Sequence, residues 1–319
     1  MRVLLVGAGG VIGSRIVPRL VERGHDVVGT TTKTDRFSYL RALGAEPVVL
    51  DLLDPEAVRR VVREARPDAI INEATALTGL TFPRNLDSAF VMTNRLRTEG
   101  TDNLLAAARE AGVTRFVAQG FAPLRYARIG GPVKTEDDPL DDNPLPGTAR
   151  TYAAVDYLDR TVRAAGGIVL RYGAFYGEPS DPLAAAIRKR QFPIVGEGNG
   201  VFSFVHLDDA AEATVLALAH DGAGAFNIAD DDPIPIHAFL PAAAGILGAK
   251  PPRHVPVWIA KIIAGPAAVM LATAARGVSN EKAKRELGWQ PRYASWREGF
   301  AATYGQGDDA MRRAHLRTA

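Results

Sequence analysis

The chain of 319 residues contains no cysteine and carries almost no net charge. The absence of thiols excludes disulfides, thiolate nucleophiles and cysteine-ligated metal sites, and it is typical of a reducing compartment. The 38 basic and 36 acidic residues are interspersed and sum to +2, so the chain has no field of one sign for a polyanion. We therefore expect no nucleic-acid partner.

Three further features are missing: a signal-like start, closely spaced histidines and a long uninterrupted apolar run. The chain enters an apolar run at Val3 without a preceding basic segment, so we expect a cytoplasmic protein. The six histidines are never paired at helical spacing, and we expect no metal site. Lys261 and Pro266 interrupt the most apolar stretch, WIAKIIAGPAAVMLATAA, which predicts a buried helix broken near Pro266 rather than a membrane span.

The sequence does contain a series of short β-branched runs separated by helical stretches. Such runs are apolar rather than alternating, which is typical of parallel strands buried on both faces, and the helices between them supply the crossovers. We therefore predict an α/β fold with a doubly wound parallel sheet. The six predicted strands are RVLLV, DVVGT, EPVVL, DAIIN, RFVAQ and GIVLR.

The pattern changes after the fifth run. Residues 120–147 are rich in proline, glycine and aspartate, and a loop of this length usually serves a site or covers one. Beyond Gly177 the proline density rises, which indicates a smaller lobe. We assign residues 1–172 and about 201–230 to the main domain, 173–200 and 231–305 to the C-terminal lobe, and 306–319 to a polar tail.

A glycine turn lies between the first predicted strand and the first helix, in VLLVGAGGVIGSRIVPRL. Glycines at these positions let a pyrophosphate approach the backbone, and the start of the helix favours its negative charge. The alternative is a tight turn without a ligand. The predicted dinucleotide contacts at this turn are Gly7, Gly10, Val11, Ile12 and Gly13.

The segment after the second strand bears on the choice of cofactor. An acidic residue there would bind the ribose hydroxyls of NAD, but this chain has Thr31, Lys33 and Arg36, which leave room for a 2′-phosphate. NADP is therefore the predicted cofactor, with NAD as the alternative if Lys33 and Arg36 are only solvated charges. Farther on, Asp51 is placed to accept a hydrogen bond from adenine, and Asp54 is read as a helix N-cap.

Several motifs occur in one order over about residues 1–300: VGAGGVIG, DLLD, NEAT, LRYGAFYGE, FSFVHLDDAAEA and KAKRELGWQPRYASWREGF. In this order they resemble the extended short-chain dehydrogenase/reductases of the NAD-dependent epimerase/dehydratase group. The resemblance implies a Rossmann domain for the cofactor, a C-terminal lobe that closes over a small-molecule substrate, and often a homodimer. It places further cofactor contacts on Asp51, Leu52, Glu73 and Ala74, and on Tyr172, Gly173 and Phe175 beside the nicotinamide.

The catalytic positions depart from that family. The resemblance implies a Ser or Thr after the fifth strand, then a Tyr and, four residues later, a Lys. Here Gln119 follows the strand, and the pair falls either on Tyr152 and Asp156 or, one residue earlier, on Thr151 and Val155. Neither register contains a lysine.

The missing lysine limits what Tyr152 can do. In the family the lysine lowers the pKa of the tyrosine, whereas an ionised Asp156 one helical turn away would raise the pKa of Tyr152. We therefore expect a neutral phenol that donates a proton but is no base. Gln119 and Lys134 are candidate orienting groups; the alternatives are an amide bonded to backbone and a solvated loop lysine.

The predicted function is an oxidoreductase, epimerase or dehydratase of this extended type, acting on a small carbonyl- or hydroxyl-bearing metabolite. The alternatives are a cofactor-binding sensor or scaffold that has lost redox chemistry, and a lyase or isomerase whose cofactor is structural.

Overall fold

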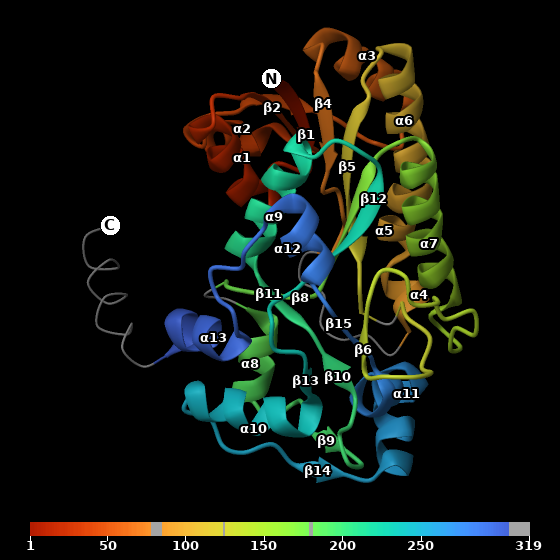
Figure 1. Cartoon of the computed structure of the whole chain (residues 1–319), viewed down its shortest axis with the longest axis vertical. Coiled ribbons are helices and arrows are strands. Elements are labelled where there is room, and N and C mark those ends of the chain that lie inside the picture. The colour runs from red at the N-terminus through yellow and green to blue at the C-terminus, as the bar shows by residue number, and fades with distance from the viewer. Residues whose placement is uncertain (78–84, 124, 179–180, 306–319) are drawn as a thin grey trace.

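The computed structural model describes residues 1–77, 85–123, 125–178 and 181–305. A central sheet, flanked by helices, stands above a smaller lobe (Figure 1). The strand order is β12-β7-β5-β4-β1-β2-β3, and every neighbouring pair is parallel, which confirms the Rossmann-type α/β fold. The strands are β1 (Arg2–Val6), β2 (Asp26–Thr31), β3 (Glu46–Val49), β4 (Ala69–Asn72), β5 (Arg115–Phe121), β7 (Ile168–Tyr172) and β12 (Gly224–Ile228).

The pleat of β1 explains why its sequence is apolar throughout. Val3 and Leu5 belong to the core on one face of the sheet, whereas Leu4 and Val6 belong to the core on the other face. Helices cover both faces, so neither set of side chains reaches water. The covering helices are α1 (Gly13–Glu22) and α9 (Leu207–Ala219) on one face, and α3 (Pro55–Ala65), α6 (Thr101–Glu110) and α7 (Ala149–Ala164) on the other.

Two helix starts follow from their sequences. The side chain of Asp54 accepts hydrogen bonds from the backbone amides of Glu56 and Ala57, at 3.0 and 3.1 Å, and so caps α3 as predicted. His206 caps α9, because its Nδ1 accepts from the amide of Asp208 at 3.1 Å. Burial lowers the pKa of His206, which fits a structural role for this imidazole.

The C-terminal lobe has its own core, in which Phe204 stacks on Phe239 with ring centroids 4.4 Å apart, beside Trp296 and Phe300. Its helices are α8 (Pro182–Arg188), α10 (Ile236–Ile246), α11 (Val257–Ala274) and α13 (Trp296–Tyr304), whereas α12 (Glu281–Leu287) packs on the central sheet beside α9 and β12. The short strands are β6 (Val133–Lys134), β8 (Ala174–Tyr176), β9 (Ile194–Val195), β10 (Val201–Phe202), β11 (Phe204–His206), β13 (Ile234–Pro235), β14 (His254–Val255) and β15 (Gly277–Val278). The remaining short helices are η1 (Thr34–Arg36), α2 (Phe37–Ala42), α4 (Leu86–Ala89), α5 (Val91–Arg95) and η2 (Leu96–Gly100).

For the most apolar stretch, the predicted break in the helix is right and the predicted burial is wrong. The helix α11 is broken next to Pro266, where Gly265 takes a φ of 84°. It is not buried, however, because Trp258 is 65% exposed and Ile262 is 71% exposed. By length and composition alone α11 is apolar enough to cross a membrane, with 17% of it buried. The error arose because apolar composition does not say which helix faces find a partner.

Candidate cofactor and substrate site

The glycine turn at the end of β1 is shaped by its own backbone. Gly7 has a φ of 82°, and a Cβ at this position would lie 2.9 Å from the carbonyl oxygen of Glu73. A Cβ at Gly13 would collide with the carbonyl of Gly7. By contrast, a Cβ at Gly10 would touch only the Gly7 carbonyl, at 3.1 Å, and one at Gly9 would meet nothing closer than 4.0 Å. The turn itself thus needs glycine at positions 7 and 13. Gly9 and Gly10 instead leave the outer side of the turn open.

The start of α1 adds a charge preference to this open side. The N-cap residue is Ile12, which makes no side-chain cap, and the first turn of α1 contains no acidic residue. The first backbone amides of a helix lack intrahelical partners and favour an anion. The turn therefore has the space and the charge preference that the diphosphate of a dinucleotide needs, and the contacts of Gly7 to Gly13 with it stay a prediction.

The residues predicted to choose between NAD and NADP lie across the turn from Gly9. A Cβ at Gly9 would come 4.0 Å from Cγ of Arg36 and 4.0 Å from Oγ1 of Thr31. Arg36 and Lys33 are both exposed, so their charges are accessible. Asp51 is exposed and accepts from the amide of Leu53 at 2.9 Å through one oxygen. The neighbouring Leu52 is buried, 4% exposed.

Glu73 follows β4 and is enclosed by protein. Oη of Tyr172 donates to one carboxyl oxygen at 3.2 Å and lies 2.6 Å from Oγ1 of Thr214. The other carboxyl oxygen has no hydrogen-bond partner among the described residues. Burial raises the pKa of Glu73 to about 8, so this group is protonated at neutral pH. Its neighbour Ala74 donates from its amide to Oδ1 of Asn72 at 3.2 Å.

The segment after β7 connects this half of the site to the substrate side. Gly173 is required by packing, since a Cβ there would lie 2.7 Å from the carbonyl oxygen of Ser203. The ring of Tyr172 lies 5.1 Å from that of Phe175, centroid to centroid. Phe175 reaches the wall of a large cavity, whereas Tyr172 is buried beneath it.

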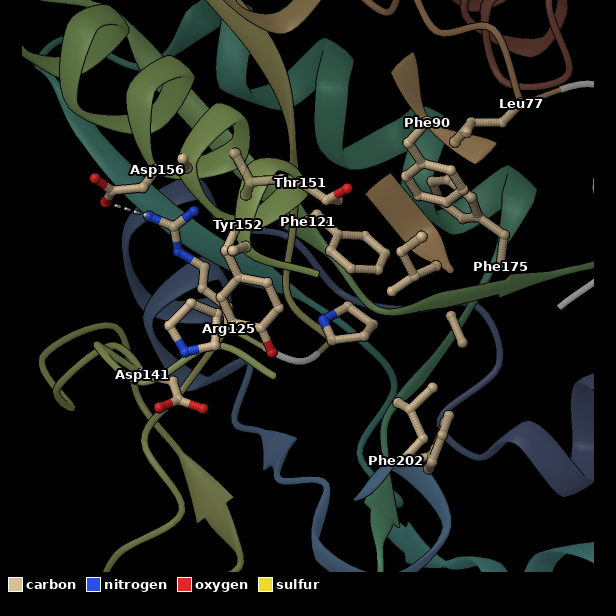
Figure 2. A pocket seen from close by; sticks show the side chains of 18 of the residues that line it. Leu77, Phe90, Phe121, Arg125, Asp141, Thr151, Tyr152, Asp156, Phe175 and Phe202 are labelled. Atoms are coloured by element: carbon tan, nitrogen blue, oxygen red, sulfur yellow. Dashed lines mark ion pairs between the residues drawn. The ribbon is translucent and has the colours of Figure 1, made fainter. Parts of the chain in front are cut away.

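That cavity has a volume of about 580 Å³ and lies between α7, the loop after β5, β8 and α8. Figure 2 shows aromatic side chains from separate segments turned toward one space. A cavity of this size and lining accommodates a small molecule with a ring. Its aromatic lining residues are Phe90, Phe121, Tyr152, Phe175 and Phe202, and its leucines are Leu77, Leu86, Leu140, Leu183 and Leu271.

The charged lining is sparse: Asp141, Asp156, Asp181 and Arg125. Each of the three carboxylates has another side chain as a partner, and burial raises the pKa of Asp181. Arg125 is the one cation among the described residues that line the cavity. The partners are Arg128 for Asp141 at 3.2 Å, Nε of Arg160 for Asp156 at 2.7 Å, and Oη of Tyr304 for Asp181 at 2.7 Å.

Both candidate registers of the catalytic pair lie on the cavity wall. Thr151, Tyr152, Val155 and Asp156 all line it, because they occupy adjacent positions on one side of α7. The hydroxyl of Thr151 accepts from Nδ2 of Asn94 at 3.2 Å. The wall of α7 therefore presents a phenol, a hydroxyl, a carboxylate and an apolar side chain, but no cation.

Tyr152 has a raised pKa, as predicted, but for another reason. Burial is the largest cause, followed by the charge of Asp141, while Asp156 does not contribute. Asp156 is instead engaged by Arg160 and lies 3.6 Å from Nη2 of Arg125. The phenol is neutral at physiological pH and is not a base.

The two candidate orienting groups lie off the cavity wall. Lys134 is buried, 2% exposed, and its Nζ donates to the carbonyl of Ile129 at 2.6 Å and to Asp138 at 3.1 Å. It is thus neither solvated nor at the cavity, because its own loop folds around it. Gln119 is half-buried within β5, and Phe121 is the residue of this strand that reaches the cavity.

Comparison with known proteins agrees with this geometry. A model of the NAD dependent epimerase/dehydratase family matches residues 3–229. The chain belongs to this family. It is 42% identical over 308 residues to a 3-diazoavenalumate denitrifying reductase of a Streptomyces species, covering 94% of this chain and 99% of that protein. It is 26% identical over 349 residues to a UDP-glucose 4-epimerase of Corynebacterium glutamicum, covering 97% of each.

Solved structures of the epimerase/dehydratase family share the fold. A UDP-glucose 4-epimerase of Thermus thermophilus in complex with NAD has a TM-score of 0.72 and 26% identity, covering 95% of this chain and 98% of that one. The epimerase of Thermotoga maritima with UDP-glucose has a TM-score of 0.74 at 22% identity, covering 98% and 99%. The chain is therefore an oxidoreductase or epimerase of the extended short-chain type, in an NAD-dependent family.

Some site residues of this family member were not found from the sequence. Arg125 was overlooked because it lies in a polar loop, where arginines are usually solvated. Thr214 lies within an alanine-rich helix, and only the tertiary structure brings it to Tyr172. The five aromatic residues that line the cavity are the feature of the sequence from which it could have been inferred.

Proposed function

We propose that this protein is a reductase that uses NADPH to replace the diazo group of an aromatic compound by hydrogen, with release of N2. The 42% identical relative, whose name describes a denitrifying reductase of a diazo compound, supports this activity. The observation that carries the proposal is the cavity wall on α7, which is buried and aromatic and offers no lysine to a proton relay.

Removal of a diazo group by hydride does not need the tyrosine and lysine that relay a proton in this family. Reduction of a carbonyl leaves an alkoxide that must be protonated, which is the task of the tyrosine and lysine implied by the family resemblance. With an arenediazonium group, the hydride forms a C–H bond and the C–N bond breaks, so that N2 leaves with the bonding pair: R–N2⁺ + H⁻ gives R–H + N2. Charge and atoms balance without a proton. Reduced nicotinamide supplies the hydride when it is bound.

The residues of the cavity then have two tasks. Phe121, Tyr152 and Phe175 would hold the ring in place, since aromatic side chains pack against planar ligands at low entropic cost. The same apolar wall would keep water from the electrophilic carbon, where attack by water would form a phenol instead. Tyr152 is in this account a packing residue rather than a proton donor.

A nucleotide sugar fits this cavity poorly. A uridine diphosphate carries two negative charges, whereas the described lining residues include one arginine and three carboxylates. Oxidation of a sugar alcohol by a nicotinamide also requires a base for the hydroxyl proton, and α7 has no lysine to support Tyr152 in that task. These features favour a reductase over an epimerase for this member of the family.

The preference for NADPH is a separate part of the proposal. Thr31 and Arg36 lie within reach of the outer side of the glycine turn at Gly9, and Lys33 is exposed close by in the chain. A guanidinium there would bind a 2′-phosphate in a bidentate manner, and β2 ends in Thr31 rather than in an acidic residue that would bind the ribose hydroxyls of NAD.

The test uses purified protein, diazotised 3-amino-4-hydroxycinnamate and NADPH deuterated at C4. We expect equal amounts of NADPH consumed, N2 released and product formed, with deuterium at the carbon that carried nitrogen. A parallel reaction with ordinary NADPH in D2O should leave that carbon without deuterium. Unchanged diazo compound, or solvent-derived deuterium at that carbon, would overturn the proposal.

A further inference from the structure

We propose that Arg125, supported by Arg97, binds a carboxylate of the substrate and makes the enzyme selective for anionic aromatic compounds. The inference rests on the proposed function, because it defines a second determinant of the same cavity. It concerns a group remote from the reacting carbon.

Arg125 is a buried guanidinium with unused donors. Its side chain is 5% exposed and lines the cavity, and its Nε and Nη2 have no hydrogen-bond partner among the described residues. Its Nη2 lies 3.3 Å from Asp159 and 3.6 Å from Asp156, which are ion-pair distances without hydrogen-bond geometry. Leaving the donors of a buried charged group unpaired is costly, so such donors indicate a missing acceptor.

The nearby carboxylates are committed to other arginines. Asp159 accepts from Nε of Arg171 at 2.8 Å and from Nε of Arg163 at 2.7 Å, and Nη2 of Arg171 reaches it at 3.2 Å. Asp156 accepts from Nε of Arg160 at 2.7 Å. Arg125 therefore shares two carboxylates that already have better-placed partners.

Arg97 adds a second unpaired cation behind the wall. Its side chain is buried, 6% exposed, with its guanidinium carbon 5.9 Å from the ring centroid of Phe121. Its Nη1 has no hydrogen-bond partner among the described residues. Burial and the charge of Arg125 lower the pKa of Arg97 to about 10, which still leaves it charged at neutral pH. The two guanidinium groups repel each other. An anion bound in the cavity beside Arg125 would reduce that repulsion.

The position of Arg125 fits a substrate bound by its two ends. In Figure 2 Arg125 and Asp156 lie at one side of the cavity, whereas Phe175 and Leu77 lie at the opposite side. Phe175 belongs to the segment that the family resemblance places beside the nicotinamide. A carboxylate at Arg125 would thus place the far end of a planar molecule at the reacting side, and a guanidinium matches the two oxygens of a carboxylate.

The experiment measures binding without turnover, so that it does not depend on the diazo chemistry. The protein saturated with NADP⁺ is titrated with trans-cinnamate and with methyl trans-cinnamate in a calorimeter. We expect cinnamate to bind about 10- to 100-fold more tightly than the ester, which has the same ring but no charge. In Arg125→Met the two compounds should bind equally, and in Arg97→Met the preference should fall by several fold.

Arg285→Met is the matched control, because Arg285 is a 66% exposed arginine that pairs with Glu286, and neither residue is among those that line the cavity. It should keep the full preference. Equal binding of acid and ester to the wild-type protein would overturn the inference even if Arg125→Met fails to fold, and so would a preserved preference in a folded Arg125→Met protein. If the protein reduces the diazo compound but shows no preference for the carboxylate, only this inference is refuted. If it prefers the carboxylate but does not reduce the diazo compound, only the proposed function is refuted.

Discussion

The cofactor half of the site and the substrate half differ in how much of the family's chemistry they keep. The half built on β1, β2 and β4 has the expected glycines, an uncapped helix start and no acidic residue in that first turn. The half built on α7 and the loop after β5 has an aromatic wall that includes Tyr152, a single arginine and no lysine among its described lining residues. The cofactor half binds the dinucleotide that supplies the hydride. The substrate half contains the positions at which the family has its proton relay.

This difference is consistent with the proposed reaction, which uses a dinucleotide but needs no proton relay. Loss of cofactor binding would relax the glycine turn, yet Gly7 and Gly13 are still in contact with backbone that leaves no room for a side chain. Loss of function altogether would not explain a cavity of about 580 Å³ lined by five aromatic residues. The proposed reduction, which consumes no proton, would account for both halves.

The largest expected effect comes from blocking the cofactor half. Gly10→Val should lower affinity for NADPH by at least about 100-fold, because the side chain fills the open side of the turn. The fold should persist, since a Cβ at Gly10 touches only the carbonyl of Gly7 at 3.1 Å. Fluorescence titration with NADPH and thermal unfolding measure the two quantities. Gly245→Ala, in an open position on α10, is the control; unaltered NADPH affinity in Gly10→Val would place the cofactor elsewhere.

A smaller effect is expected at Glu73, and it depends on pH. Its pKa is about 8 in the folded protein against an ordinary 4.5, so between these values the folded state holds a proton that the unfolded state releases. Stability therefore falls as pH rises from 4.5 to 8, and the full cost is present above 8. Glu73→Gln should remove this cost and raise the free energy of unfolding by about 2 kcal/mol at pH 8, with little gain at pH 4.

Urea unfolding of both proteins at the two pH values measures this difference. Thr214→Val is a useful companion, since it removes the other partner of Tyr172 without touching the carboxyl group. A gain from Glu73→Gln that is the same at pH 4 and pH 8 would mean that Glu73 is not protonated in the folded protein.

A change at Arg36 should separate the two dinucleotides. Arg36→Ala is expected to weaken NADPH binding by about tenfold and to leave NADH binding unchanged, because only NADPH has the 2′-phosphate. Arg41→Ala is the matched control. Arg41 lies in α2, where its guanidinium packs over the ring of Phe37 of the same helix. Equal losses for the two dinucleotides would assign Arg36 to the fold or to the shared part of the cofactor.

The sequence predicted the sheet and the glycine turn well, because both are local. Strands buried on two faces need continuous apolar runs, and a strand followed by Gly7, Gly10 and Gly13 has few other uses. The seventh strand, β12, was not predicted, since GAFNI contains a glycine and an asparagine, which are rare in strands, and its partner β7 is distant in the sequence. The assignment of residues to two domains and the exact cofactor contacts stay predictions.

The cavity was not predictable in the same way. Lys134 and Arg125 both follow β5 in one polar loop, yet the first is enclosed by its own loop and the second lines the cavity. Which of two loop cations faces a ligand depends on the path of the backbone, and neither hydrophobic periodicity nor motif spacing carries that information. The break in α11 was predictable from Pro266, but the exposure of Trp258 was not.

The smallest expected effect is at Tyr152, and it tests the contrast between the two halves most directly. Tyr152→Phe keeps the ring on the cavity wall and removes only a hydroxyl whose pKa is raised by burial. If hydride transfer to a diazonium carbon needs no proton, kcat should change by less than about threefold, whereas removal of a general acid typically costs 10²- to 10⁴-fold. Tyr152→Ala serves as the comparison, because it also removes the ring and should raise KM. A loss of about 100-fold or more in Tyr152→Phe, with KM unchanged, would show that the phenol donates a proton and that the substrate half still performs the family's chemistry.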